Sequence, residues 1–117
     1  MPNSVFRDRI ENYSNGWIVG DFAPALAHSV EVEVAIKHLK AGDREPEHFQ
    51  RQAVEITIVI HGSCRLNGEV LSAGDVLRIP ANVSGDFVAL SDVVLLVIKT
   101  PSLPGDKVVG KAITIVE

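Results

Sequence analysis

The feature that most constrains this chain is a regular alternation of side chains over residues 54–61. Every second residue from Val54 onward is aliphatic. The intervening positions are Glu55, Thr57, Val59 and His61. Successive side chains of a β-strand point to opposite faces of a sheet, so this segment predicts a strand with one apolar face and one mixed face. The mixed face is expected to direct the Glu55 carboxylate into a partly polar interior.

Turn signals divide the rest of the chain into short segments. The Asn67-Gly68 pair predicts a two-residue hairpin turn, because both central positions of a type I′ turn need positive φ. Residues 72–75 form a second turn, and Pro80 ends the strand before it because proline has no N–H to donate. Further strands are predicted at residues 17–22, 30–39, 85–90 and 93–100, with a last strand or arm at 107–116. Short strands separated by turns are typical of a sandwich or barrel.

The residues in and around these strands resemble the cupin superfamily, whose small single-domain members include the RmlC-like jelly rolls. The first cupin motif falls at about residues 42–62 and is matched by Gly42, His48, Glu55 and Gly62. The second falls at about residues 74–89 and is matched by Gly74 and Pro80. The resemblance spans roughly residues 30 to 100. It implies an all-β fold, the antiparallel double-stranded β-helix or jelly-roll barrel.

The same motifs depart from the family pattern where the family binds metal. Gln50 stands in the place of the second histidine and Gly85 in the place of the last one. Asn82 and Ala89 are further departures. Two of the four family ligands are therefore absent, and glutamine binds metals weakly through its carbonyl oxygen. No metal or other cofactor is expected; a divalent metal, if present, would be held by His48, Gln50 and Glu55.

Side chains two residues apart on an extended segment share a side, so His48 and Gln50 are expected to meet Glu55 in one hollow. The candidate ligand-binding residues are His48, Gln50, Glu55 and Thr57. His48 is the candidate catalytic base. The preferred interpretation is a small polar ligand bound in the barrel without a complete metal site. The alternatives, a sugar-nucleotide epimerase or ketoisomerase and a divalent-metal-dependent cupin enzyme, stay open, as does whether the chain is catalytic.

Several other side chains have two interpretations. Arg78 and Lys99 could attract an anion, although charged strand residues are more simply solvated. Trp17 and Phe22 could line a pocket mouth or pack in the core. The 30–39 strand places His38 on its apolar side, which predicts a hydrogen-bonded structural histidine. Cys64, the single cysteine, excludes an internal disulfide and is expected to be a buried apolar residue in a reducing compartment.

Length and composition bound the remaining possibilities. The 117 residues are expected to form one domain, residues 1–117, with an N-terminal arm at 1–13. The net charge of −4 without a basic run argues against nucleic acid and anionic membranes as partners. A cytoplasmic protein is expected, because no signal peptide or spanning segment is recognisable. Hydrophobic residues make up 46% although aromatic residues make up only 5%. This aliphatic surplus predicts a homodimer.

Overall fold

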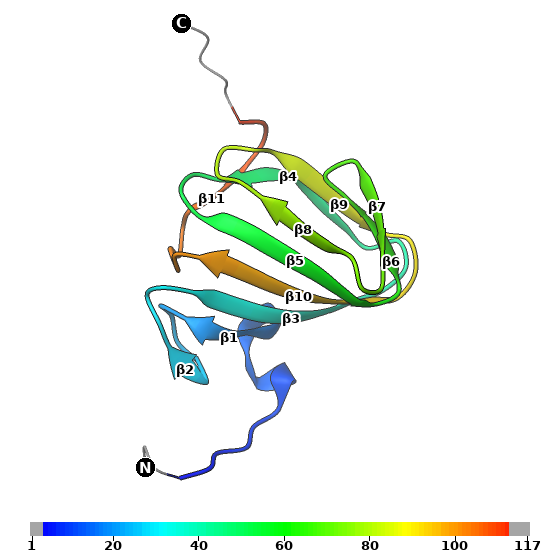
Figure 1. Ribbon diagram of the computed structural model, residues 1–117. Coiled ribbons are helices and arrows are strands. Elements are labelled where there is room, and N and C mark those ends of the chain that lie inside the picture. The colour runs from blue at the N-terminus through cyan, green and yellow to red at the C-terminus, as the bar shows by residue number, and fades with distance from the viewer. Residues whose placement is uncertain (1–3, 113–117) are drawn as a thin grey trace, which may run out of the picture.

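The computed structural model describes residues 4–112, which form two facing β-sheets (Figure 1). The six-stranded sheet has the order β2 (Ala27–His28), β1 (Trp17–Gly20), β3 (Glu33–Leu39), β10 (Val93–Thr100), β5 (Val54–His61) and β8 (Val76–Ile79). The five-stranded sheet has the order β11 (Lys107–Val109), β4 (Arg44–Gln50), β9 (Gly85–Ala89), β6 (Ser63–Leu66) and β7 (Glu69–Ser72). Two short 3₁₀ helices, η1 (Ile10–Asn12) and η2 (Ser14–Gly16), precede β1. The predicted all-β jelly-roll class is confirmed.

The predicted turns form as expected. Asn67 and Gly68 have φ values of 54° and 80° and join β6 to β7. The N–H of Asp75 donates to the carbonyl of Ser72 at 2.9 Å, which closes the second turn. Strand β8 ends directly before Pro80, and β10 has the predicted bounds. Strand β11 covers the start of the predicted 107–116 segment, whose residues 113–116 lie outside the described residues.

Strand β3 corrects the expectation for residues 30–39 in two respects. It begins only at Glu33, and its inner face carries Glu33, Ala35 and Lys37. The apolar side with His38 faces outward, so His38 is exposed and is not a buried structural histidine. The alternation of residues 30–39 is present, but periodicity alone does not indicate which face of the strand meets the opposite sheet.

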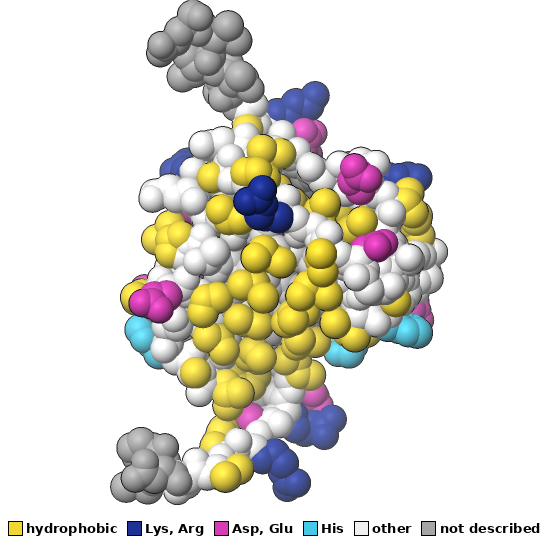
Figure 2. Space-filling view, in the orientation of Figure 1, with side chains coloured by type: hydrophobic (Ala, Val, Ile, Leu, Met, Phe, Trp, Pro, Cys, Tyr) yellow, Lys and Arg dark blue, Asp and Glu magenta, His cyan; other side chains and the backbone are white. Residues whose placement is uncertain are grey.

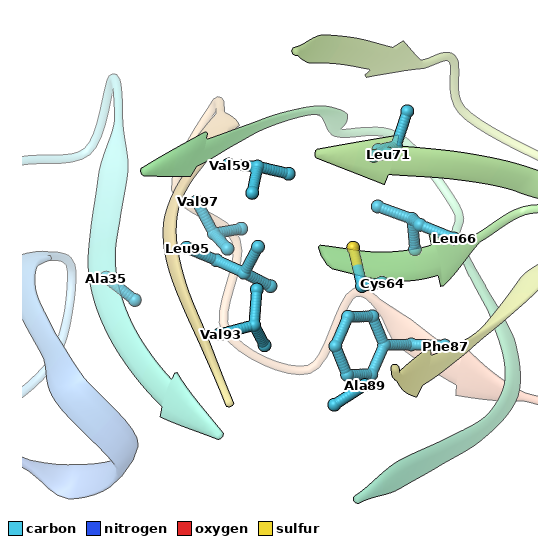
Figure 3. Packing of buried hydrophobic residues seen from close by; sticks show 10 residues of the cluster. All are labelled: Ala35, Val59, Cys64, Leu66, Leu71, Phe87, Ala89, Val93, Leu95 and Val97. Carbon is cyan, nitrogen blue, oxygen red and sulfur yellow. The ribbon is translucent and has the colours of Figure 1, made fainter. Parts of the chain in front are cut away.

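The core lies between the two sheets at one end of the barrel (Figure 3). Val93, Leu95 and Val97 of β10 face Cys64 of β6 and Phe87 of β9 across the interior. Cys64 is fully buried, as predicted, and burial raises the pKa of its thiol. The described residues include no helix with the length and apolar character needed to cross a membrane.

Strand β4 contains a bulge that determines which of its side chains reach the interior. It starts at Arg44 and includes Pro46. Its pairing with β9 shifts between Glu45 and His48, where proline can sit without costing a ladder hydrogen bond. A strand without a bulge would send residues 45 and 48 to opposite faces. The bulge lets both Glu45 and His48 line the barrel cavity.

The carboxylate of Asp106 connects the C-terminal segment to the turn between β4 and β5. It is 7% exposed and accepts hydrogen bonds from the backbone N–H groups of Gln52 and Ala53, at 3.0 and 2.9 Å to Oδ2. The Asp106 carbonyl also accepts from Arg51 N–H at 3.1 Å. These bonds satisfy donors that no strand ladder reaches, and they fix the 101–106 loop beside the barrel mouth.

We expect the substitution Asp106→Ala to lower the free energy of unfolding by roughly 2–4 kcal/mol, because it removes charge-assisted bonds and leaves buried N–H groups unpaired. Urea unfolding followed by circular dichroism measures the change. The matched control is Asp86→Ala, whose side chain is exposed on β9. Equal effects of the two substitutions would contradict the role assigned to Asp106.

Candidate functional site

The interior of the barrel changes from apolar to polar along β10. The inward residues Val93, Leu95 and Val97 belong to the core, and the next inward residue is Lys99. Lys99 is paired across the sheet with Glu33 on one side and Glu55 on the other. We call this row of three charged side chains the charged rung. It marks the polar end of the barrel.

A cavity of about 270 Å³ opens at this polar end and is called the barrel cavity below. Three of the four residues selected from the sequence, His48, Glu55 and Thr57, line it. The hydroxyl of Thr57 donates to Glu55 Oε2 at 3.2 Å, which orients the carboxylate. His48 Nδ1 lies 2.9 Å from the carbonyl of Pro46, so Nδ1–H donates and Nε2 remains as the free ring nitrogen.

Gln50, the fourth residue selected, reaches the site from a different direction. It lines a small cleft together with His48, Glu55 and Gly85, and it also lines a second, larger pocket. Its side chain is 5% exposed, and its Nε2 amide is buried without a hydrogen-bond partner in the part of the chain described. Native proteins rarely leave a buried donor unpaired. The Gln50 amide is therefore an unpaired donor in the wall of these two pockets.

The second pocket, called the side pocket below, has a volume of about 290 Å³. It shares Trp17, Lys99 and Lys107 with the barrel cavity, so the two spaces adjoin. Phe22 and Glu33 are among its other lining residues. Phe22 lines the side pocket, and Trp17 both lines the two cavities and packs against the core.

Three lysines surround the junction of the two cavities. Lys37 Nζ and Lys99 Nζ lie 5.3 and 4.9 Å from the centroid of the Trp17 ring, within range of cation–π attraction. Lys37 Nζ also lies 3.8 Å from Glu45 Oε1. Lys107 is exposed at the mouth. The expectation that Lys99 is solvated is wrong, because its strand position points inward; Arg78 is exposed.

Burial shifts the protonation of two members of the charged rung. It lowers the pKa of Lys99; the charges of Glu55 and Glu33 oppose this shift, whereas Lys107 and Lys37 add to it. Burial also raises the pKa of Glu33, although the charge of Lys99 opposes the rise. Desolvation disfavours the charged form of each group, so each becomes a better proton-transfer partner than its exposed counterpart.

The residues present do not fit the metal site of the family. A Cβ built on Gly85 would lie 1.8 Å from Asn67 Oδ1, so the Asn67 side chain occupies the space where the last family histidine would begin. Within residues 4–112, no three His, Cys, Asp or Glu side chains are grouped so that they could hold a metal ion. His48 and Glu55 alone fall short of the three or four protein ligands that a stable site needs.

Three charged side chains of the site are not recognisable from the sequence: Glu33, Lys37 and Lys107. Glu33 and Lys37 share the inner face of β3. A charged residue in a strand is normally read as solvated. For Glu33 and Lys37, the sequence signal was their alternation with Ala35, a small residue that suits a crowded interior.

Comparison with known proteins supports the fold and leaves the activity open. No protein-family model and no curated protein matches the sequence. Among solved structures, KdgF from Halomonas sp. is 24% identical, with a TM-score of 0.61, over 67% of this chain and 76% of KdgF. An RmlC-like cupin from Shewanella frigidimarina is 22% identical, with a TM-score of 0.59, over 64% and 70% of the two chains.

A third similar structure is the bacterial pirin YhhW from Escherichia coli in complex with nickel(II). It is 19% identical, with a TM-score of 0.63, over 74% of this chain and 39% of the pirin. At these identities the likeness concerns the fold, and the bound nickel belongs to the pirin. Two facing sheets in jelly-roll order, with cupin structures as neighbours, identify this chain as a member of the cupin fold, the double-stranded β-helix.

Proposed function

We propose that this chain binds a small organic anion at the polar end of its barrel without a complete set of metal ligands. The observation that carries the proposal is the buried Gln50 amide, whose Nε2 lacks an acceptor. Gln50 lines the side pocket together with Lys99 and Lys107. A carboxylate or phosphate oxygen placed there accepts from the amide and gains from both nearby amines.

The proposal extends the four residues selected from the sequence. His48, Gln50, Glu55 and Thr57 are proposed to contact the ligand, with Gln50 and Lys107 holding its anionic group. His48 and Glu55 face the rest of the ligand from the barrel cavity. A neutral part of the ligand packs on Trp17, because an aromatic ring offers apolar contact to a molecule whose charged end is held elsewhere.

The isomerase alternative depends on His48 as a base, and its free Nε2 suits that role. No tyrosine of the described residues lines the barrel cavity to act as its partner acid. The hydroxyl of Tyr13, the single tyrosine, donates to Asp8 at 2.8 Å, and Tyr13 does not line the barrel cavity. We therefore place binding ahead of this alternative.

The substitution Gln50→Leu tests the binding proposal because it removes the amide and keeps a similar volume. We expect anion affinity to fall at least about tenfold, since one hydrogen bond to a charged group contributes roughly 1.5–3 kcal/mol. We also expect the free energy of unfolding to rise by about 1 kcal/mol, because an unpaired buried donor is removed. Calorimetric titration with succinate and with inorganic phosphate measures affinity, and urea unfolding measures stability.

The matched control is Gln52→Leu, a glutamine of the adjoining turn that lines neither the barrel cavity nor the side pocket. In NMR spectra of the wild-type protein, the resonance of the Gln50 side-chain amide should shift when succinate is added. Wild-type protein that binds neither probe, or a Gln50→Leu variant that binds as well as the wild type, would contradict the proposal.

We also propose that the chain forms a homodimer through the outer face of the six-stranded sheet. Aliphatic side chains cover this face as a continuous patch over β3, β10, β5 and β8 (Figure 2). Cross-strand pairing places Ile36, Leu96, Ile58 and Val76 in one row. Val34, Ile98 and Ile56 form the next row, which Arg78 ends. Monomeric proteins rarely expose so continuous an apolar surface.

A second copy is the occupant that this face favours. Both rows are apolar across three central strands, and Arg78 ends one of them. His38 and His61 flank Val94 in a third row, at one edge of the apolar surface. Such a surface complements itself about a two-fold axis, because an apolar centre meets an apolar centre and polar groups fall at the rim.

We expect Leu96→Glu to convert the dimer to a monomer, since the substitution buries a carboxylate at the centre of the interface. Sedimentation equilibrium at micromolar concentration is the measurement. Val70→Glu is the control, because Val70 is exposed on β7 of the other sheet. A monomeric wild type would exclude this assembly.

A further inference from the structure

Lys99 differs from the other lysines of the site in what surrounds its amine. Lys37 Nζ has Glu45 Oε1 within 4 Å, whereas Lys99 Nζ makes no ion pair and no hydrogen bond within residues 4–112. It lines both the barrel cavity and the side pocket, so its amine borders the space proposed for the ligand. Lys99 Nζ lies 4.9 Å from the centroid of the Trp17 ring. The Lys99 amine thus faces a space that a bound molecule can enter.

This environment raises the neutral fraction of the Lys99 amine above that of an exposed lysine, and the neutral amine is the nucleophilic form. Burial is the main reason that the pKa of Lys99 lies below its ordinary value. The charged groups around it are Glu33 and Lys37 of β3, Glu55 of β5 and Lys107 of β11, with His48 of β4 in the same cavity. Lysines in apolar, partly cationic pockets are the ones that react with carbonyl compounds.

We propose that Lys99 captures a small anionic aldehyde or ketone as an imine. This inference rests on the proposed function, because Gln50 and Lys107 must hold the anionic group while the carbonyl carbon meets the amine. The ligand class is therefore an oxo acid, a molecule that carries a carboxylate or phosphate and an aldehyde or ketone.

The step balances without an oxidant or reductant. The Nζ lone pair of Lys99 attacks the carbonyl carbon, a C–N bond forms, and the oxygen takes up the proton that the nitrogen releases. The resulting carbinolamine then loses water, with a proton delivered to the departing oxygen. Glu33 is the proposed donor, because it lines the side pocket with Lys99 and burial raises its pKa. Amine and carbonyl become imine and water.

Reductive trapping tests the inference. Wild-type protein is incubated with pyruvate and sodium cyanoborohydride, and intact mass followed by peptide mapping locates the adduct. We expect one reduced pyruvyl group per chain, at Lys99. The adduct should be lost in both Lys99→Met and Lys99→Arg, whereas Lys40→Arg, at an exposed lysine, should retain it. Excess succinate should reduce trapping, because it competes for the anion site without offering a carbonyl.

The outcomes separate this inference from the proposed function. Succinate binding without an adduct at Lys99 overturns the imine and leaves anion binding in place. An adduct spread evenly over exposed lysines such as Lys40 also overturns it. Absence of both binding and trapping overturns both proposals. Circular dichroism of the Lys99→Met and Lys99→Arg variants identifies any loss that comes from unfolding.

Discussion

The site depends on the charged rung, which lies where the apolar core of the barrel ends. Lys99 is paired across the sheet with Glu33 and Glu55, so a cation lies between two carboxylates on three neighbouring strands. Removing charges from water is costly, and mutual attraction offsets that cost only in part. The lowered pKa of Lys99 and the raised pKa of Glu33 both show that the cost is not fully offset. Shifted pKa values of this kind are typical of binding and catalytic sites.

The surrounding fold keeps this rung in position. The apolar end of β10 packs between the sheets, the bulge at Pro46 turns His48 inward, and Asp106 holds the loop beside the side pocket. At Gly85, the Asn67 side chain fills the space where the family carries a metal ligand. The interior of this jelly roll therefore carries amines and an amide beside the single imidazole of His48. Fold similarity alone would have pointed to a metal.

The two faces of the six-stranded sheet divide the roles of this protein between them. The inner face carries the core and the charged rung, and the outer face carries the aliphatic rows of β3, β10, β5 and β8. This is why β10 appears apolar on both faces in the sequence. Strand β10 lies centrally within its sheet, and its outer residues are half-buried.

Most strands, the predicted turns and the fold class follow from the amino-acid sequence, whereas β2, β4 and the start of β3 do not. Alternation, the Asn67-Gly68 pair and Pro80 act locally, so they can be read without knowing what lies opposite. The sequence also selected His48, Gln50, Glu55 and Thr57, because a motif and a strand period place them together. The inward orientation of Lys99, Glu33 and Lys37 is visible only in the folded structure. The same holds for the contact of Asn67 with Gly85. Those facts depend on which sheet face meets which, and on a bulge and a turn far apart in the chain; local periodicity carries no information about either.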